Sequence, residues 1–561
     1  MLLLWRFLLV KEPPPRPKPP ATAASQVANQ PAPVGQATAS EKGAKKSATA
    51  AARKGAEGFP VVEGTAAEEV VVEGDLYRVT FSTQGAVVRS WVLKKYTDAN
   101  QQPLDVVNQP ACEKLGYPIS LSLAMDQTLA SKLNSALYVV KPSGGTLAAP
   151  VTLEFVYSDG HVEARKQFTF GRGYEVGVKV RVSDGQRDLP AEVAWRGGFG
   201  DHSLDQVQQQ TLEQAVYSGA NGVKTVAEKK LKTDEMVPGP LYFGGVEDRY
   251  FGGIFLPASP ADAFRIAKQE WIPPNWNNPK ITPNLIEGGL VSPEAKPLDF
   301  RLFVGPKDLD VLRAVEPPLD GLLDFGFFGV IAKPLFICLR YIFDHWVHNW
   351  GWAIVILTIL INLAMFPLKL KSVRSAQEMQ RVAPIIKGIQ DRYKQYKMND
   401  PRKQKMNQEI MKIYSEHGIN PLGGCLPMLP QLPILYAFYR VLELPIELRH
   451  APWIWWIKDL SQPDTSHIFG LPVPILPTLM IVTMFIAQKM TPMPTADPQQ
   501  KTMMFLMPLV FGIMFYRFAS GLVLYFMAAN VVGIAQQALI NKMTPRPAAL
   551  TAPEKAGAGK V

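Results

Sequence analysis

Residues 350–443 most constrain what this chain can fold into, because an apolar span there runs into a basic amphipathic segment and then into a second apolar span. Residues 350–370 carry no charge before Lys369, and an α-helix of about 20 residues crosses the hydrocarbon of a bilayer. Thr358 and Asn362 lie four residues apart and therefore share one face of this helix. Because polar groups are costly in lipid, we expect that face to meet protein or water.

The composition separates the chain into two unlike halves. The mean hydropathy of +0.01 averages a soluble part, up to about residue 320, with a mostly membrane-embedded part after it. The net charge of +10 lies largely in loops beside apolar spans, which indicates positive-inside topology and not nucleic-acid binding. Cys112, Cys338 and Cys425 lie far apart and form no CxxC pair, so we expect no disulfide framework and no metal site.

The first 69 residues predict an anchor and a tether. Residues 1–10 are apolar apart from Arg6, but ten helical residues reach only about 15 Å and cannot cross a core of roughly 30 Å alone. We interpret them as the end of a signal-anchor helix whose start lies upstream, with an interfacial stub as the alternative. Residues 11–69 are rich in proline, alanine and lysine and predict a disordered linker.

Residues 70–319 predict an all-β sandwich domain. Short β-branched and aromatic runs at residues 77–82, 87–93, 151–157 and 174–182 are separated by turn clusters at residues 158–160 and 183–185, which is typical of such folds. The acidic residues, His161 and His202 form no motif that indicates a reaction. We therefore predict a non-catalytic domain.

The rest of the chain predicts an α-helical membrane bundle of five spans. Residues 320–348 are aromatic but carry charges along one side, which favours an amphipathic helix in the interface plane. The insertion between the first two spans, residues 371–418, is basic and has helical periodicity broken at Asn399-Asp400-Pro401, so we expect a cytoplasmic helical hairpin. Its basic face suits anionic lipid or ribosomal RNA, or is a solvated topology signal. The spans are expected at about residues 350–370, 422–443, 471–488, 503–518 and 520–540.

The sides of the membrane follow from the flanking residues. Trp453, Trp455 and Trp456 mark an outer loop between the second and third spans. The basic tail, residues 543–561, places the C-terminus in the cytoplasm and residues 70–319 outside it. Sending that domain outward requires a further span at the N-terminus.

The polar groups within the spans are mostly uncharged amides and hydroxyls. No Asp, Glu or His lies within residues 350–370 or 520–540, whereas proton-coupled transport uses such relays. The sequence also has no P-loop and no detectable inverted repeat. A wet groove that hosts a polypeptide fits this pattern, although amides that hydrogen-bond one helix to another, Gln536 and Gln537 above all, explain single residues as well.

A series of short motifs follows the chain through the membrane half. In order they are Asn349-Trp350-Gly351-Trp352, Met365-Phe366-Pro367-Leu368, Asn420-Pro421-Leu422-Gly423-Gly424-Cys425, Leu448-Arg449, Trp456-Ile457-Lys458-Asp459-Leu460-Ser461, Gln488-Lys489-Met490 and Ser520-Gly521-Leu522-Val523-Leu524-Tyr525. Over about residues 320–542 their order and spacing resemble the YidC/Oxa/Alb insertase family, in the Gram-negative YidC type with a large periplasmic domain.

The resemblance implies a periplasmic supersandwich domain, an insertase core at residues 349–542 with a hydrophilic groove, and a cytoplasmic hairpin that receives substrate. It implies a multi-pass protein of the bacterial inner membrane that is not an enzyme and uses no cofactor. Its partners would be nascent membrane proteins, the lipid bilayer, the Sec translocon, and the ribosome or signal recognition particle pathway through the hairpin and tail.

The implied groove residues are Thr358, Asn362, Gln431, Arg517 and Phe526. The family usually has arginine where this chain has Asn362, an aromatic residue at Arg517, and tyrosine at Phe526. We therefore hypothesise that Arg517 supplies the groove charge, and the alternative is that it extends to the outer headgroups.

Two other function classes remain open at this stage. One is a polytopic transporter or channel, which would need a continuous pore through the bundle. The other is a tethered carbohydrate-active enzyme, which would need a cleft with paired carboxylates in the β domain.

Overall fold

The structure is a computed structural model that describes residues 58–185, 187–203, 213–273, 284–396, 400–419, 428–464, 466, 474–491 and 498–544. The chain divides into two compact units, Met1–Ala56 and Glu57–Val561, and only the second is described below. The expected anchor, nearly all of the linker, Cys425 and the C-terminal tail from residue 545 lie outside the described residues.

The β domain contains nineteen named strands among the described residues. They are β1 (Glu69–Glu73), β2 (Tyr77–Ser82), β3 (Val87–Thr97), β4 (Pro103–Asp105), β5 (Ser120–Ser122), β6 (Val139–Lys141), β7 (Thr146–Ala148), β8 (Val151–Ser158), β9 (Val162–Phe170), β10 (Glu175–Asp184), β11 (Arg187–Asp188), β12 (Ala191–Trp195), β13 (Gln214–Gly219), β14 (Gly222–Ala227), β15 (Glu235–Glu247), β16 (Phe251–Pro257), β17 (Ala261–Glu270), β18 (Asn284–Ser292) and β19 (Leu298–Pro306). Helices α2 (Gln109–Leu115), α3 (Gln127–Ser135) and α5 (Leu309–Ala314) accompany them.

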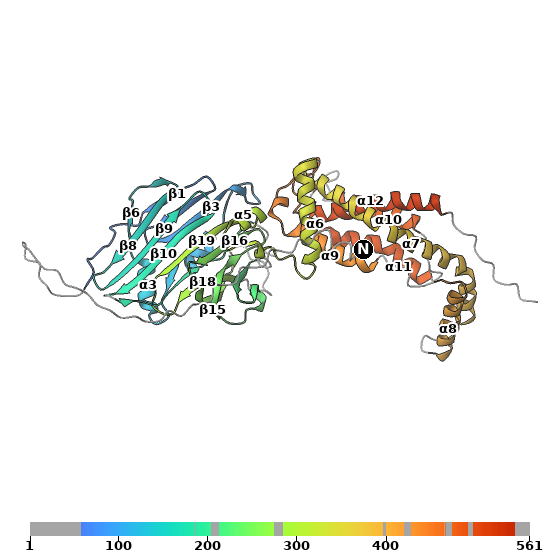
Figure 1. Ribbon diagram of the computed structural model, residues 1–561, viewed down its shortest axis with the longest axis horizontal. Coiled ribbons are helices and arrows are strands. Elements are labelled where there is room, and N and C mark those ends of the chain that lie inside the picture. The colour runs from blue at the N-terminus through green and yellow to red at the C-terminus, as the bar shows by residue number, and fades with distance from the viewer. Residues whose placement is uncertain are drawn as a thin grey trace, which may run out of the picture. The chain divides into compact units, whose positions relative to one another are not determined.

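Two sheets enclose one aromatic core (Figure 1). The smaller has the order β4-β3-β2-β1-β7, and the path of the larger is β5-β12-β18-β17-β15-β16-β19-β10-β9-β8-β6. Trp91 of β3 packs on Trp195 of β12 at 6.3 Å between ring centroids, and Phe81 of β2 packs on Phe168 of β9 at 4.7 Å. The predicted all-β domain is confirmed, and the run predicted at residues 77–82 coincides with β2.

One residue on the buried face of β9 is charged. The alternation of β9 turns Ala164, Lys166, Phe168 and Phe170 inward, and Lys166 is fully buried. Its ammonium donates to the carbonyls of Gly85 at 2.7 Å, Ala86 at 3.2 Å and Ile119 at 2.8 Å. Lys166 therefore ties together two chain segments that strand pairing does not hold.

We expect Lys166 to make the stability of the β domain depend on pH. Burial lowers the pKa of Lys166 to about 7, against about 10.4 in an unfolded chain. Between these values the unfolded chain binds the extra proton, so this residue's contribution to the free energy of unfolding rises with pH. Between about pH 7 and pH 9, the free energy of unfolding should rise by about 2 kcal/mol more in wild type than in K166M, as measured by unfolding of the full chain.

Comparing wild type with K166M cancels the effect of other groups that titrate in the same pH range. Burial raises the pKa of Glu213 to about 8, so ionisation of this carboxyl lowers the stability as pH rises through the same window. That effect is present in both proteins and cancels in the difference. Equal pH slopes for wild type and K166M would contradict the expectation.

The C-terminal half is helical. Its helices are α6 (Gly329–Ile342), α7 (Trp350–Arg392), α8 (Pro401–Glu416), α9 (Met428–Glu443), α10 (Ile475–Met490), α11 (Pro498–Phe515) and α12 (Ser520–Met543). The Asn349 side chain caps α7 by accepting from the backbone N–H of Trp352 at 3.1 Å. Among the described helices, α7 and α12 are long and apolar enough to cross a membrane, while α10 and Phe505–Phe515 are shorter apolar helices.

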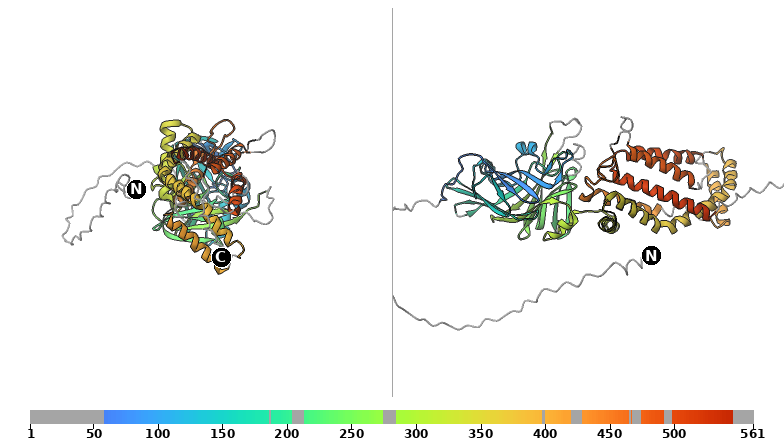
Figure 2. Two further views of the ribbon diagram at one scale, coloured as in Figure 1. Left: turned by 90° about the vertical axis from the view of Figure 1, so that its right-hand side faces the viewer. Right: turned by 90° about the horizontal axis from the view of Figure 1, so that it is seen from above.

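The helices pack side by side (right-hand view of Figure 2). α12 contacts α7, α9 and α10, and α6 contacts α7 and α9. α7 is one continuous helix, whereas the sequence analysis placed a boundary at Leu370. The charges that begin there end the apolar span but do not end the helix, since lysine and arginine are good helix formers.

Beyond the apolar span, α7 packs on α8. Met379, Val382 and Ile386 of α7 form a small buried core with Ile419, and α8 adds Ile410, Ile413 and Tyr414. All of these positions except Ile419 belong to the helical periodicity that predicted the two arms of a hairpin.

The loop that follows α9 contacts the β domain through a buried ion pair. Arg449 Nη2 lies 2.6 Å from Asp201 Oδ2, and the two side chains are 5% and 0% exposed. The Arg449 guanidinium also lies 5.5 Å from the ring centroid of Phe251. Such a pair, removed from water on both sides, fixes one relative placement of the residues that carry it.

Candidate functional site

Two polar residues follow one face of the apolar part of α7. Thr358 is fully buried, and its hydroxyl donates to the carbonyl of Ile354 at 2.7 Å. One turn later the Asn362 amide donates to the carbonyl of Thr358 at 2.9 Å. Both of these side-chain hydrogen bonds stay within α7. The backbone carbonyl of Asn362 can still accept a hydrogen bond from another helix.

α12 supplies the partner of that carbonyl. Gln536 donates from Nε2 to the Asn362 backbone oxygen at 2.9 Å, and its own Oε1 accepts from Lys369 Nζ at 3.1 Å. Lys369 Nζ also donates to the carbonyl of Gly533 at 3.3 Å. We call Thr358, Asn362, Lys369, Gly533 and Gln536 the polar seam.

The geometry of the polar seam follows from helical spacing. Lys369 lies seven residues after Asn362, two turns along α7, so both project toward α12. A side chain at Gly533 would approach Lys369 Nζ to 3.3 Å, so glycine leaves room for the ammonium group. Gln536 thus joins a backbone carbonyl and a cation that lie two turns apart on the facing helix.

The polar seam carries an uncompensated positive charge. Within the part of the chain that the structure describes, Lys369 forms no ion pair, and its two hydrogen bonds go to neutral oxygens. A cation beside apolar helices is costly unless an anion or water reaches it. The arrangement therefore suits transient contact with a polar or acidic chain segment.

The other expected groove residues lie outside this cluster. Gln431 is exposed on α9, and no hydrogen bond among the described residues joins it to the polar seam. Phe526 is partly buried on α12 and packs on Phe515 of α11 at 4.6 Å between ring centroids. It lies ten residues before Gln536, about 15 Å along the helix.

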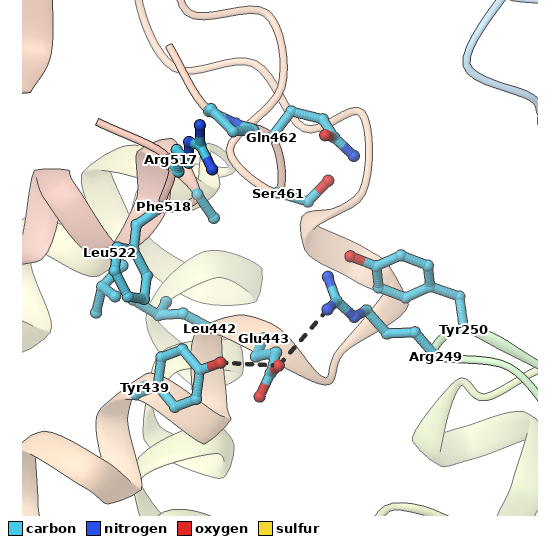
Figure 3. Close-up of a pocket in the computed structure, with 12 residues that line it drawn as sticks. Arg249, Tyr250, Tyr439, Leu442, Glu443, Ser461, Gln462, Arg517, Phe518 and Leu522 are labelled. Atoms are coloured by element: carbon cyan, nitrogen blue, oxygen red, sulfur yellow. Dashed lines mark hydrogen bonds and ion pairs between the residues drawn. The ribbon is translucent and has the colours of Figure 1, made fainter. Parts of the chain in front are cut away.

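The structure does not bring Arg517 to Asn362. Arg517 stands just before α12, in a cavity with Arg249 and Glu443 (Figure 3). Gln536, which contacts Asn362, lies 16 residues into α12 from Ser520, about 24 Å away along the helix. Arg517 therefore does not supply a charge beside Asn362, because it lies at the opposite end of α12.

Lys369 is instead the cation that shares Gln536 with the Asn362 carbonyl, and sequence reasoning missed it. The sequence marked Lys369 only as the end of the apolar span, although its seven-residue spacing from Asn362 was the available signal. Gln536 was expected to hydrogen-bond one helix to another, and it does.

The β domain also contains a cleft with paired carboxylates, of about 720 Å³. Glu192 Oε1 accepts from Arg265 Nε at 2.8 Å, Arg265 also pairs with Glu287, and Arg196 Nε lies 3.1 Å from Glu287 Oε1. Both carboxylates are thus held by guanidinium groups. Glycoside chemistry needs one carboxyl as a proton donor and another free to attack or to activate water. Burial raises the pKa of Glu192, but Glu287 is held by two guanidinium groups and is not free for the second role.

Comparisons with known proteins cover both halves of the chain. Residues 69–338 match the family described as YidC periplasmic domain, and residues 342–547 match the family described as 60Kd inner membrane protein. The chain is 32% identical to the membrane protein insertase YidC of Syntrophus aciditrophicus, with 97% of each chain covered. It is 35% identical to that of Pelobacter propionicus, over 85% of this chain and 87% of the relative.

A solved structure is also similar. The crystal structure of an active YidC insertase with its first transmembrane domain resolved shares 18% identity, with a TM-score of 0.35, over 85% of this chain and 93% of that one.

Proposed function

This chain belongs to the YidC family of membrane protein insertases, and from that premise we propose that it receives its substrates at the polar seam between α7 and α12. Its substrates are membrane proteins, its setting is the inner membrane with a periplasmic β domain, and its work is not enzymatic. Thr358, Asn362, Lys369 and Gln536 line the proposed groove, and Gln431 and Phe526 are assigned to it by the family resemblance alone.

The contact between Gln536 and Asn362 carries this proposal. Amide hydrogen bonds can join helices in lipid, but a cation that forms no ion pair among the described residues, as Lys369 does here, is costly there unless water or an anion reaches it. A hydrophilic segment that crosses the membrane exchanges its hydration for hydrogen bonds from these groups, which lowers the crossing barrier. The apolar helix of the substrate then enters lipid and gains the free energy of burial there.

The topology and the remaining partners are part of the proposal. Five spans place the C-terminus and the α7–α8 region in the cytoplasm, by the positive-inside rule. The basic residues of 371–418 and of the tail then face the ribosome or the signal recognition particle pathway, and the core works alone or beside the Sec translocon.

Complementation tests the proposal. In cells depleted of their own insertase, this chain should restore insertion of a small two-span membrane protein, followed by protease protection. A variant with Thr358→Val, Asn362→Leu and Gln536→Leu keeps α7 and α12 apolar and should accumulate without restoring insertion. Full activity of that variant would contradict the role of the polar seam.

The same depleted cells distinguish insertion from the alternative function, transport. Failure of this chain to restore insertion in them, together with solute flux that depends on it, would favour transport. The named relatives favour insertion.

A further inference from the structure

A cavity of about 230 Å³ lies where residues of the β domain meet the ends of three helices (Figure 3). Arg249 enters it from the turn between β15 and β16, and Glu443 from the end of α9. Arg517 and Phe518 enter it from the turn between α11 and α12. These residues are distant in sequence, and the fold brings them to one partly open cavity.

The charges in this cavity do not balance. Glu443 is the one acidic residue among those that line it. Its carboxylate already accepts from Arg440 Nη1 at 2.8 Å and from the Tyr439 hydroxyl at 2.9 Å, and it lies 3.6 Å from Arg249 Nη2. Arg517 is exposed and forms no ion pair with any described residue. Two guanidinium groups, Arg249 and Arg517, thus line the cavity with one carboxylate, which Arg440 already contacts from outside the lining, so the lining carries an excess of one positive charge.

The carboxylate of Asp459, which lies outside the cavity lining, is also bonded to other groups. Asp459 Oδ2 lies 3.2 Å from His450 Nδ1, and Asp459 Oδ1 accepts from the hydroxyl and backbone N–H of Ser461. It therefore does not neutralise Arg517.

The cavity lies at the level where the apolar helices end. The last turn of α11 exposes Ile513 (70%) and Met514 (47%) immediately before Arg517, and α12 begins at Ser520. Phe518 and Leu522 give the cavity an apolar wall beside the arginines. A charged recess with an apolar wall at the end of membrane helices matches a lipid, whose phosphate is joined to acyl chains.

We propose that the cavity binds the phosphate of an anionic phospholipid between Arg517 and Arg249, so that one lipid joins the bundle to the β domain. Guanidinium groups bind phosphate oxygens through paired, charge-assisted hydrogen bonds. The Ser461 hydroxyl and Gln462 amide add polar partners for the headgroup. The proposal needs the chain to be membrane-embedded but does not depend on the polar seam.

Lipid titration of the purified full chain in a neutral detergent tests this site. The thermal unfolding midpoint is followed against short-chain dihexanoyl phosphatidylglycerol, dihexanoyl phosphatidylcholine and inorganic phosphate. We expect saturable stabilisation by phosphatidylglycerol, and weaker effects of the other two. R517Q should weaken the phosphatidylglycerol affinity at least tenfold, and it should fold because Arg517 is exposed.

Two further variants serve as controls. R249K keeps the charge that faces Glu443 but loses the paired geometry, and we expect intermediate affinity. R313Q removes the same charge from an exposed site on α5, away from the cavity, and should leave the affinity unchanged.

Four outcomes would overturn the proposal. Unchanged affinity in R517Q would place the lipid elsewhere, and an equal loss in R313Q would reduce the effect to surface charge. Inorganic phosphate binding as tightly as the lipid would assign the cavity to a free anion. Stabilisation by a soluble acidic peptide, lost in R517Q, would assign it to a polypeptide. Each readout is independent of insertion, so loss of insertion by the polar-seam variant leaves this test intact.

Discussion

Replacing Lys369 by glutamine is expected to slow insertion of substrates with acidic translocated segments by about tenfold or more, because a hydrogen bond to a charged group contributes about 1.5–3 kcal/mol. Lys369 contacts only neutral oxygens among the described residues, so its charge is available to a passing carboxylate. Glutamine keeps a donor for the Gln536 side chain and removes only the charge. The measurement is the rate of protease protection of one two-span substrate, made with either Asp and Glu or Asn and Gln in its translocated segment.

The control variant is K371Q. Lys371 is exposed and lies two residues further along α7, about 200° around the helix from Lys369. The K371Q variant removes one positive charge near the same membrane boundary and leaves the residues of the polar seam unchanged. We expect K371Q to insert both substrates at the wild-type rate, and K369R to retain most of the preference for the acidic one. Equal slowing of both substrates by K369Q would show that Lys369 only holds α7 to α12.

The elements of this fold were predictable wherever local periodicity determines them. The run at residues 77–82 became β2, and the turn clusters at Gly160 and Gly185 became turns with positive φ, which glycine adopts without strain. The pairing of strands was not predictable, because β12 lies beside β5 and β18, far away in sequence. Such non-local order depends on how the two inner faces pack, which no local pattern encodes.

Two of the five polar-seam residues, Thr358 and Asn362, were expected as groove residues from the sequence. Thr358 and Asn362 share a helix face by spacing alone, and the structure places them together. Lys369 was hidden because lysine at the end of a span is also a topology signal, and only its contact with Gln536 separates the two roles. The hypothesis that placed Arg517 beside Asn362 was wrong, because the sequence does not show how far along α12 the contact with Asn362 of α7 lies.

Breaking the buried ion pair between Arg449 and Asp201 is expected to release the loop after α9 from the β domain. Loss of one partner from a buried pair costs about 3–5 kcal/mol, because the other charge stays buried and unpaired. The pair is buried on both sides, and the guanidinium also lies on the Phe251 ring. We expect R449M to raise amide hydrogen exchange of β16 and of residues 444–451 by about a hundredfold or more, measured on the purified full chain.

The matched control is a solvent-exposed ion pair within the β domain. Lys179 Nζ lies 3.1 Å from Asp299 Oδ2, with side chains 65% and 51% exposed, and such pairs contribute about 0–1 kcal/mol. K179M should therefore leave exchange nearly unchanged.

The double variant R449M/D201N separates the charge pair from simple packing. It removes both buried charges, so if unpaired charge is the main cost it should exchange more slowly than R449M alone. If it exchanges as fast as the sum of the single changes predicts, then the contact of Arg449 with Phe251, and not the ion pair, holds the loop against the β domain.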